Sequence, residues 1–213
     1  MQPMSERYNA RIQEYADSYE SFARAAALFF YRENAGYKWI PQALKYEGRR
    51  SLGRYFGLRL GRELAQSPLF GDVDLVVPVP LHPWRHFRRG YNQAAVLARA
   101  VCGAYAVAAC PVSPPFAVRP SVPLFASGLV LRTRATRSQT RLSGEEKAKN
   151  VAGAFRISPH AFARLPFPPR HILVVDDVFT SGATLAAVHN ALRTVFPPEI
   201  RISVATLAFV QGE

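Results

Sequence analysis

The residues best suited to chemistry are two adjacent carboxylates, Asp176 and Asp177, which follow a short apolar run and precede a stretch of small residues. Carboxylates can accept hydrogen bonds from ribose hydroxyls and can help to hold a hydrated Mg²⁺. The small residues lead into a predicted helix, where backbone amides without acceptors and the helix dipole favour a bound phosphate. The expected phosphate loop consists of Thr180, Ser181, Gly182, Ala183 and Thr184. One loop would therefore bind a sugar and its phosphate together.

Residues 172–184, ILVVDDVFTSGAT, closely resemble the phosphoribosyl-diphosphate (PRPP) binding motif of type I phosphoribosyltransferases. That motif has four apolar residues, two acids and a small-residue phosphate loop, and the resemblance covers every position of the segment. Two alternatives stay open. A capped strand-to-helix turn in an unrelated protein would use the same residue types, because Ser, Thr and Asp are good helix N-caps. An acid pair of the Walker B type is the other alternative, although no Gly-x-x-x-x-Gly-Lys-Ser/Thr sequence accompanies it.

The elements around this segment predict an α/β protein. Apolar, largely β-branched runs predict strands at residues 74–80, 129–131, 153–157, 171–175 and 202–210. Helical spacing of apolar residues predicts two helices bent near Gly48 within residues 36–64, and further helices at 92–101, 143–150 and 184–194. Residues 25–31 fit either a strand or the end of a helix, and loops are predicted at 82–90, 111–123 and 159–169. Strands that alternate with helices argue for an open, mostly parallel sheet, and such sheets bind ligands at their carboxyl edge.

Two more segments are similar to the ComF/ComFC competence family. Residues 77–94, VPVPLHPWRHFRRGYNQA, resemble its Pro-Val-Pro … Arg-Gly-Tyr/Phe-Asn-Gln element. Residues 132–155 resemble a second element, which corresponds here to Thr136, Gln139, Leu142, Ser143, Asn150, Val151, Ala154 and Phe155. With the Lys45-Tyr46-Glu47-Gly48 turn, the resemblance runs through residues 36–210. It implies a type I phosphoribosyltransferase-like fold, with helices on both faces of the sheet and a basic hood, or hairpin, over the site.

The resemblance also implies roles for individual residues. The pyrophosphate loop would consist of Val79, Pro80, Leu81, Arg85 and Arg89, and the hood would contribute Arg132, Arg137, Gln139, Lys147 and Asn150. Asp176 and Asp177 would be catalytic, with Mg²⁺ held through PRPP beside them. Simpler roles stay open, because exposed arginines are often merely solvated and amides such as Gln139 can equally pin a hairpin. Lys147 stands where the family more often has arginine, which keeps the charge but loses bidentate phosphate geometry.

Composition limits the partners without choosing one. The chain has 213 residues and a formal net charge of +12, from 27 Lys+Arg against 15 Asp+Glu. This charge suits a polyanion such as nucleic acid, PRPP or an acidic lipid headgroup, and equally a solvated basic surface. The length fits one domain. We expect residues 1–35 to be an extension in place of the family's four-cysteine zinc module, and residues 36–213 to form the phosphoribosyltransferase-like domain.

Cysteine usage and hydropathy bear on zinc binding, membrane insertion and the expected compartment. Cys102 and Cys110 alone cannot form a zinc site, so no zinc is expected. No run reaches the ~20 apolar residues that a membrane-spanning helix needs. The polar start of the chain does not resemble a secretory signal, and the expected compartment is therefore the cytoplasm.

Two functions from different classes fit these observations. The first is transfer of phosphoribosyl from PRPP to an unidentified nucleophile, with release of pyrophosphate. The second, implied by the family, is a non-catalytic accessory factor that binds PRPP and single-stranded DNA during DNA uptake with the competence machinery. Trp84, Phe87 and Tyr91 would stack bases in that role, although such aromatics more often pack in a core. A homodimer is compatible with either function.

Overall fold

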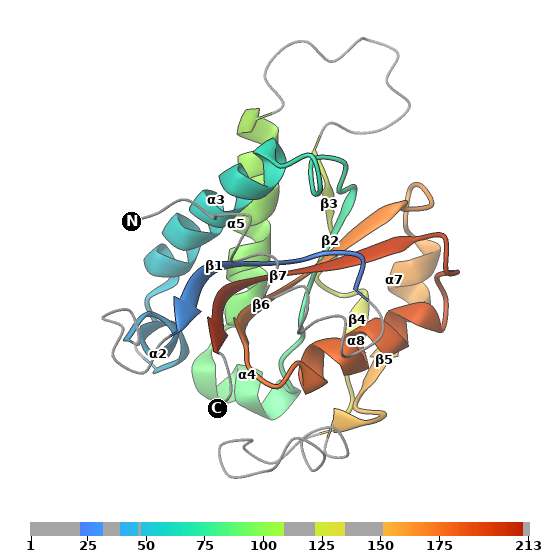
Figure 1. Ribbon diagram of the computed structural model, residues 1–213. Coiled ribbons are helices and arrows are strands. Elements are labelled where there is room, and N and C mark those ends of the chain that lie inside the picture. Colours follow the sequence, from blue (N-terminus) through green and yellow to red (C-terminus); the bar gives the residue numbers. More distant parts are fainter. Residues whose placement is uncertain (1–21, 32–38, 47, 109–121, 135–150, 211–213) are drawn as a thin grey trace.

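The computed structural model describes residues 22–31, 39–46, 48–108, 122–134 and 151–210 and contains one five-stranded parallel sheet (Figure 1). In spatial order its strands are β1 (Ala25–Tyr31), β7 (Arg201–Val210), β6 (His171–Phe179), β2 (Leu75–Pro78) and β3 (Leu124–Phe125). Every neighbouring pair is parallel. The open α/β sheet of the type I phosphoribosyltransferase-like class is thereby confirmed.

Helices cover both faces of the sheet, as expected, and a small hairpin completes one side (Figure 1). The helices are α2 (Trp39–Tyr46), α3 (Arg50–Gln66), α4 (Pro83–Arg89), α5 (Gln93–Ala108), α7 (Pro159–Ala163) and α8 (Ala183–Arg193). The antiparallel hairpin pairs β4 (Val130–Arg132) with β5 (Phe155–Ile157). Gly48, at φ +64°, separates α2 from α3, which confirms the predicted bend. Among the described residues, no helix combines the length and the apolar composition that crossing a membrane requires.

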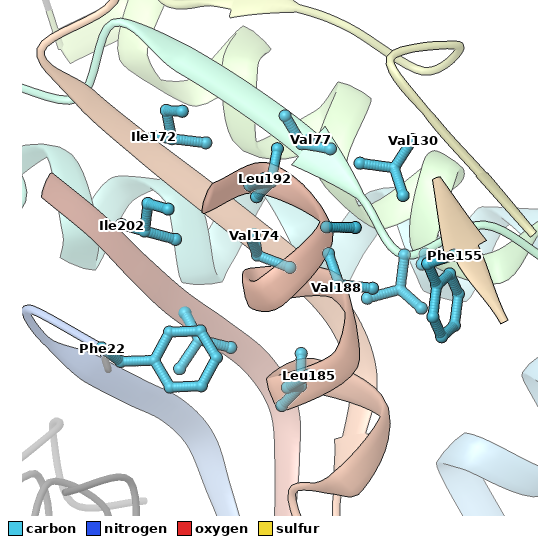
Figure 2. Close-up of a cluster of buried hydrophobic side chains, with 14 of the residues drawn as sticks. Phe22, Val77, Val130, Phe155, Ile172, Val174, Leu185, Val188, Leu192 and Ile202 are labelled. Atoms are coloured by element: carbon cyan, nitrogen blue, oxygen red, sulfur yellow. The ribbon is translucent and has the colours of Figure 1, made fainter. Parts of the chain in front are cut away.

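Alternating residues of the central strands supply two hydrophobic cores. Val77 and Val174 face α8, where Leu185, Val188 and Leu192 pack against them (Figure 2). Their neighbours, including Val76 and Leu173, face α3 and α5 on the other side of the sheet. Because both faces are covered, the strand sequences are apolar without interruption rather than alternating.

Several elements differ from the sequence-based expectation. Residues 25–31, left undecided between helix and strand, form β1 and so bring part of the expected N-terminal extension into the sheet. Helix α7 lies in a segment predicted to be a loop, and strand β3 lies just after the predicted loop at 111–123, where no element was predicted. The loop predicted at 82–90 is wrong, because α4 occupies most of it. His82 caps α4, Pro83 stands at a position that tolerates proline, and Gly90 ends the helix with φ +73°. The predicted helix at 143–150 lies outside the described residues.

A polar network that is buried at His171 and Ser203 and exposed at Asp72 joins the starting ends of β6 and β7. His171 Nδ1 donates to Asp72 Oδ1 at 2.7 Å, so Nε2 accepts from the Ser203 hydroxyl, also at 2.7 Å. Burial lowers the pKa of His171 to about 4, which keeps the ring neutral at physiological pH. The order of groups is that of a hydrolytic triad, but Ser203 and His171 are fully buried. The network therefore ties strand ends together and offers no nucleophile to a substrate.

Helices α3 and α5 approach closely because α3 presents glycine at every fourth residue, at Gly53, Gly57 and Gly61. A Cβ on Gly57 would lie 2.7 Å from the Ala100 Cβ and 2.8 Å from the Leu97 carbonyl oxygen. Backbone atoms cannot yield as a flexible side chain can, so only glycine permits this approach.

We therefore expect Gly57→Ala to lower the free energy of unfolding by about 1–3 kcal/mol, through overpacking between the helices. Gly103→Ala is the control, because Gly103 is exposed on α5 and its added Cβ would meet only Leu58 Cδ2, at 3.9 Å. That change should raise stability by about 0.5–1 kcal/mol, since alanine is the better helix former. Chemical denaturation measures both values. Equal effects of the two substitutions would contradict the close-packing account.

Candidate functional site

The acid pair lies where β6 continues past its neighbour β2. The last pair between these strands is Pro78 with Val175, whereas β7 accompanies β6 as far as Phe179. Asp176 and Asp177 were expected beyond the end of the strand, but they lie inside it, with a strand on one side only. Asp177 is buried, and its backbone N–H donates to Asp176 Oδ1 at 2.8 Å. The acid pair therefore lies where one side of β6 is open, and a backbone hydrogen bond orients the Asp176 carboxylate.

The predicted phosphate loop forms a turn that starts α8. Gly182 is at φ +70°, a conformation that favours glycine, and it occupies the N-cap position. Its carbonyl accepts the Ala186 N–H at 2.9 Å, which begins the helical hydrogen bonds. The first amides of α8 have no acceptor within the helix, and Gly182 has no side chain to cap them. The turn is therefore suited to an anion.

Asn92 holds the loop after β2 against the start of α5. Its Nδ2 donates to the Val79 carbonyl at 2.9 Å, and its Oδ1 accepts the Ala94 N–H at 3.1 Å. The Val79 N–H in turn donates to the Val175 carbonyl at 2.9 Å. One amide side chain thus caps a helix and fixes the loop that was predicted to contact pyrophosphate.

Helical spacing places the arginines of α4 on different faces of the helix. Arg85 and Arg89, four residues apart, lie on one face and border the same cavity as the acid pair. Arg88 points elsewhere, with its guanidinium 4.9 Å from the centre of the Trp84 ring. The two arginines expected to face pyrophosphate are therefore the two that the helix presents to this cavity.

Arg132 ends β4 and is largely buried, with 9% of its surface exposed. Its guanidinium lies 5.2 Å from the centre of the Phe155 ring. Burial lowers its pKa to about 10, the charge of Arg85 acts in the same direction, and Asp176 acts against them. Arg132 remains a cation at neutral pH. A bound anion would offset the free-energy cost of burying its charge.

These elements enclose a cavity of about 410 Å³, called here the phosphate-loop cavity. It brings together most of the residues proposed from the sequence: Val79, Pro80, Leu81, Arg85, Arg89, Arg132, Asp176, Asp177, Thr180, Ser181, Gly182, Ala183 and Thr184. Arg137, Gln139, Lys147 and Asn150, proposed for the hood, lie outside the described residues. The volume falls within the range of small-molecule sites. The individual ligand contacts remain predictions.

The donor set fits PRPP with Mg²⁺. Amides of the α8 turn and the cations Arg85, Arg89 and Arg132 suit phosphate groups. Asp176 and Asp177 supply carboxylate oxygens, which are acceptors for hydroxyls and ligands of the kind that Mg²⁺ prefers. Cations and carboxylates therefore share one cavity, as a charged sugar diphosphate requires.

Gln93 is a site residue that the sequence analysis did not single out. It borders the phosphate-loop cavity with only 2% of its surface exposed. Its Nε2 is buried and has no hydrogen-bond partner within the part of the chain that the structure describes. A buried amide without a partner costs stability, so a ligand that accepts a hydrogen bond from it would be favoured. The signal in the sequence was its place as the final Gln of the Arg-Gly-Tyr/Phe-Asn-Gln element.

Gln93→Met removes this donor while keeping the volume of the side chain. We expect the free energy of unfolding to rise by about 1 kcal/mol, because an unsatisfied buried group is lost. Affinity for pyrophosphate with Mg²⁺ should fall by about tenfold, measured by calorimetry. Gln66→Met, at an exposed site on α3, should change neither quantity. Unchanged pyrophosphate affinity in Gln93→Met would show that the amide serves only the core.

Comparison with known proteins places the chain in a family. No protein-family model matches it. It is 30% identical to competence protein F of Haemophilus influenzae over 169 residues, which cover 76% of this chain and 64% of that protein. It is also 35% identical to the DNA utilization protein YhgH of Escherichia coli and 32% identical to that of Salmonella typhi. Both of these alignments cover 119 residues, 56% of this chain and 43% of the relative.

The chain therefore spans less than two thirds of the length of each of these relatives. The similarity nevertheless agrees with the family resemblance of the sequence elements, and it extends over most of this chain. The chain belongs to the ComF competence family.

Proposed function

We propose that the phosphate-loop cavity binds PRPP with Mg²⁺ and that the protein transfers the phosphoribosyl group to a nucleophile, releasing pyrophosphate. The observation that supports this most is the meeting of three groups in one cavity. The acid pair Asp176 and Asp177, the amide turn at residues 180–184 and the cations of α4 and β4 all border it. A capped turn without a ligand would need none of these cations.

Each part of the cavity has a place on this ligand. The turn that begins α8 would hold the 5′-phosphate, and the carboxylates would accept hydrogen bonds from the two ribose hydroxyls. Arg85, Arg89 and the loop held by Asn92 would face the pyrophosphate. Mg²⁺ would be held through PRPP beside Asp176 and Asp177, and would neutralise charge on the pyrophosphate.

The transfer breaks the bond between the anomeric carbon and the pyrophosphate oxygen, whose electron pair leaves with pyrophosphate. A new bond forms from the nucleophile to the same carbon, and the proton of the nucleophile passes to a carboxylate or to water. Positive charge develops on the ribose ring during this exchange. Asp176, whose carboxylate is oriented by the Asp177 N–H, would stabilise that charge. Most of the catalysis would come from positioning and electrostatics.

The proposal also includes a role in DNA metabolism. One relative is named for competence and another for DNA utilization. The net charge of +12 suits work beside a polyanion. We infer that this chain acts in DNA uptake or in the use of DNA taken up.

Calorimetric titration with PRPP and Mg²⁺ tests the central proposal. We expect saturable binding by the wild type and about a hundredfold loss in Asp176→Asn, Asp177→Asn, because two charged acceptors are removed while the shape is kept. The matched control is Glu63→Gln, Glu199→Gln, which removes the same charge at positions that do not border the cavity. The proposal fails if millimolar PRPP does not bind, or if the aspartate variant binds as the wild type does.

A second candidate function, binding of single-stranded DNA, is favoured by the outer face of α4. Phe87 is 86% exposed and Trp84 is 58% exposed, next to Arg88. Exposed aromatic rings beside cations form stacking platforms for bases. Tyr91, also considered for stacking, is buried, and its hydroxyl donates to the Leu44 carbonyl. The platform would therefore consist of two aromatic residues rather than three.

For this function we expect Trp84→Ala, Phe87→Ala to weaken binding of a single-stranded oligonucleotide by at least about tenfold, since each stacked base contributes ~1–3 kcal/mol. Tyr55→Ala, an exposed aromatic on α3, is the control. PRPP binding should be unchanged in both variants. Fluorescence anisotropy at several salt concentrations measures affinity and the number of phosphate contacts. Equal affinities for wild type and the α4 variant would exclude the platform.

A further inference from the structure

A second and larger cavity lies on the α3 and α5 side of the sheet. It has a volume of about 1020 Å³ and is called here the arginine-lined cavity. Its walls come from α3, α5, β3 and the hairpin strand β4. Pro80, Leu81, Asn92 and Arg132 border both this cavity and the phosphate-loop cavity, so the two are adjacent. The arginines that α3 and α5 bring to this cavity have no role in the function proposed above.

The positive charges around this cavity make it suited to bind an anion. Four arginines border it in addition to Arg132: Arg50, Arg54, Arg99 and Arg156. Among the described residues that line it there is no aspartate or glutamate. Like charges gathered around a hollow repel one another unless an anion lies between them. Guanidinium groups also match the geometry of phosphate, to which they can donate two parallel hydrogen bonds.

Two of these arginines lie over aromatic rings. The Arg99 guanidinium carbon lies 4.6 Å from the centre of the Phe125 ring, and that of Arg50 lies 4.9 Å from the centre of Tyr91. Arg50 also donates to the Gly90 carbonyl at 3.1 Å. Such contacts restrict the side chains before any ligand arrives, which reduces the entropy cost of binding. A guanidinium plane held in this way also offers a surface on which a base can stack.

The remaining walls are apolar. Leu58, Val96 and Val130 line the cavity together with the Phe125 ring. A ligand that satisfies both parts of the lining must combine a flat apolar body with an anionic group. Inorganic phosphate would leave the apolar walls unused, and the volume is ample for a molecule of nucleotide size.

We propose that the arginine-lined cavity binds a nucleotide unit, with its base against Phe125 and Val96 and its phosphate among Arg50, Arg54 and Arg99. The unit is either a free nucleotide or one residue of a single strand. This site is separate from the PRPP site and does not depend on it. A ligand here would lie next to a ligand of the phosphate-loop cavity, because Arg132 borders both.

Calorimetric titration of the full chain with adenosine 3′-monophosphate, which lacks the 5′-phosphate that the α8 turn would hold, tests this site. We expect saturable binding, and binding at least about tenfold weaker for adenosine and for inorganic phosphate, because each lacks half of the contacts. Ala95→Phe fills the cavity from α5, and Arg99→Ala removes a cation, so each should weaken nucleotide binding by at least about tenfold. The controls are Ala106→Phe on the exposed side of α5 and Arg62→Ala on α3, which do not border the cavity.

Competition with an oligothymidylate shows whether the bound nucleotide is free or is one residue of a single strand. If the oligonucleotide displaces the nucleotide and loses affinity in Ala95→Phe, a single strand supplies the unit. If it does not compete, the ligand is a free nucleotide. The Asp176→Asn, Asp177→Asn variant should bind adenosine monophosphate as the wild type does, which keeps this test independent of PRPP. The proposal is overturned if the nucleotide does not bind at millimolar concentration, if inorganic phosphate binds equally well, or if Ala95→Phe leaves affinity unchanged.

Discussion

The site depends on a stagger within the sheet. Strand β2 ends at Pro78, opposite Val175, while β6 continues to Phe179 beside β7. Proline has no N–H to donate to a neighbouring strand, so Pro78 and Pro80 prevent β2 from following β6 further. The space left beside β6 is bordered by the loop after β2, by α4 and by the turn into α8. Asp176 and Asp177 are functional candidates because this stagger leaves one side of their strand open.

Charge balance around that space explains the rest of its lining. Two carboxylates beside one strand would repel each other in isolation, and Arg85, Arg89 and Arg132 bring cations to the same cavity. Burial lowers the pKa of Arg132 and yet leaves it charged at neutral pH. An anion that binds only the folded chain would stabilise the fold. The Gln93 amide, whose Nε2 has no hydrogen-bond partner among the described residues, would gain one from such a ligand.

The phosphate-loop cavity and the larger arginine-lined cavity share the side chain of Arg132. Arg132 borders both, and the hairpin strand that carries it packs near α8 through Val130 (Figure 2). The glycines of α3 allow that helix to approach α5 closely, and both helices contribute arginines to the second cavity. Packing between helices therefore sets the position of cations that no short sequence motif identifies.

Local patterns predicted the central strands and the main helices well. The apolar run before Asp176 and the glycine-centred turn after it were sufficient to predict the end of β6 and the turn that starts α8, since both depend on neighbouring residues alone. The helix α4 was missed because residues 82–90 were interpreted as a loop with a basic turn, although Pro83 is well suited to the first turn of a helix. Strand β3 has only two residues and is defined by its pairing with β2, which no local pattern shows. Gln93 and the arginine-lined cavity depend on burial and on distant contacts, so they became visible only in the folded chain.

A crystal structure of the protein with PRPP and Mg²⁺ tests the central claim most directly. The account predicts the 5′-phosphate against the amides of residues 180–184, the ribose hydroxyls at Asp176 and Asp177, and the pyrophosphate facing Arg85 and Arg89. A PRPP molecule bound elsewhere, or held with its phosphates away from the α8 turn, would contradict it. The phosphate-loop cavity would then be a structural feature of the fold rather than the place where this protein holds its sugar phosphate.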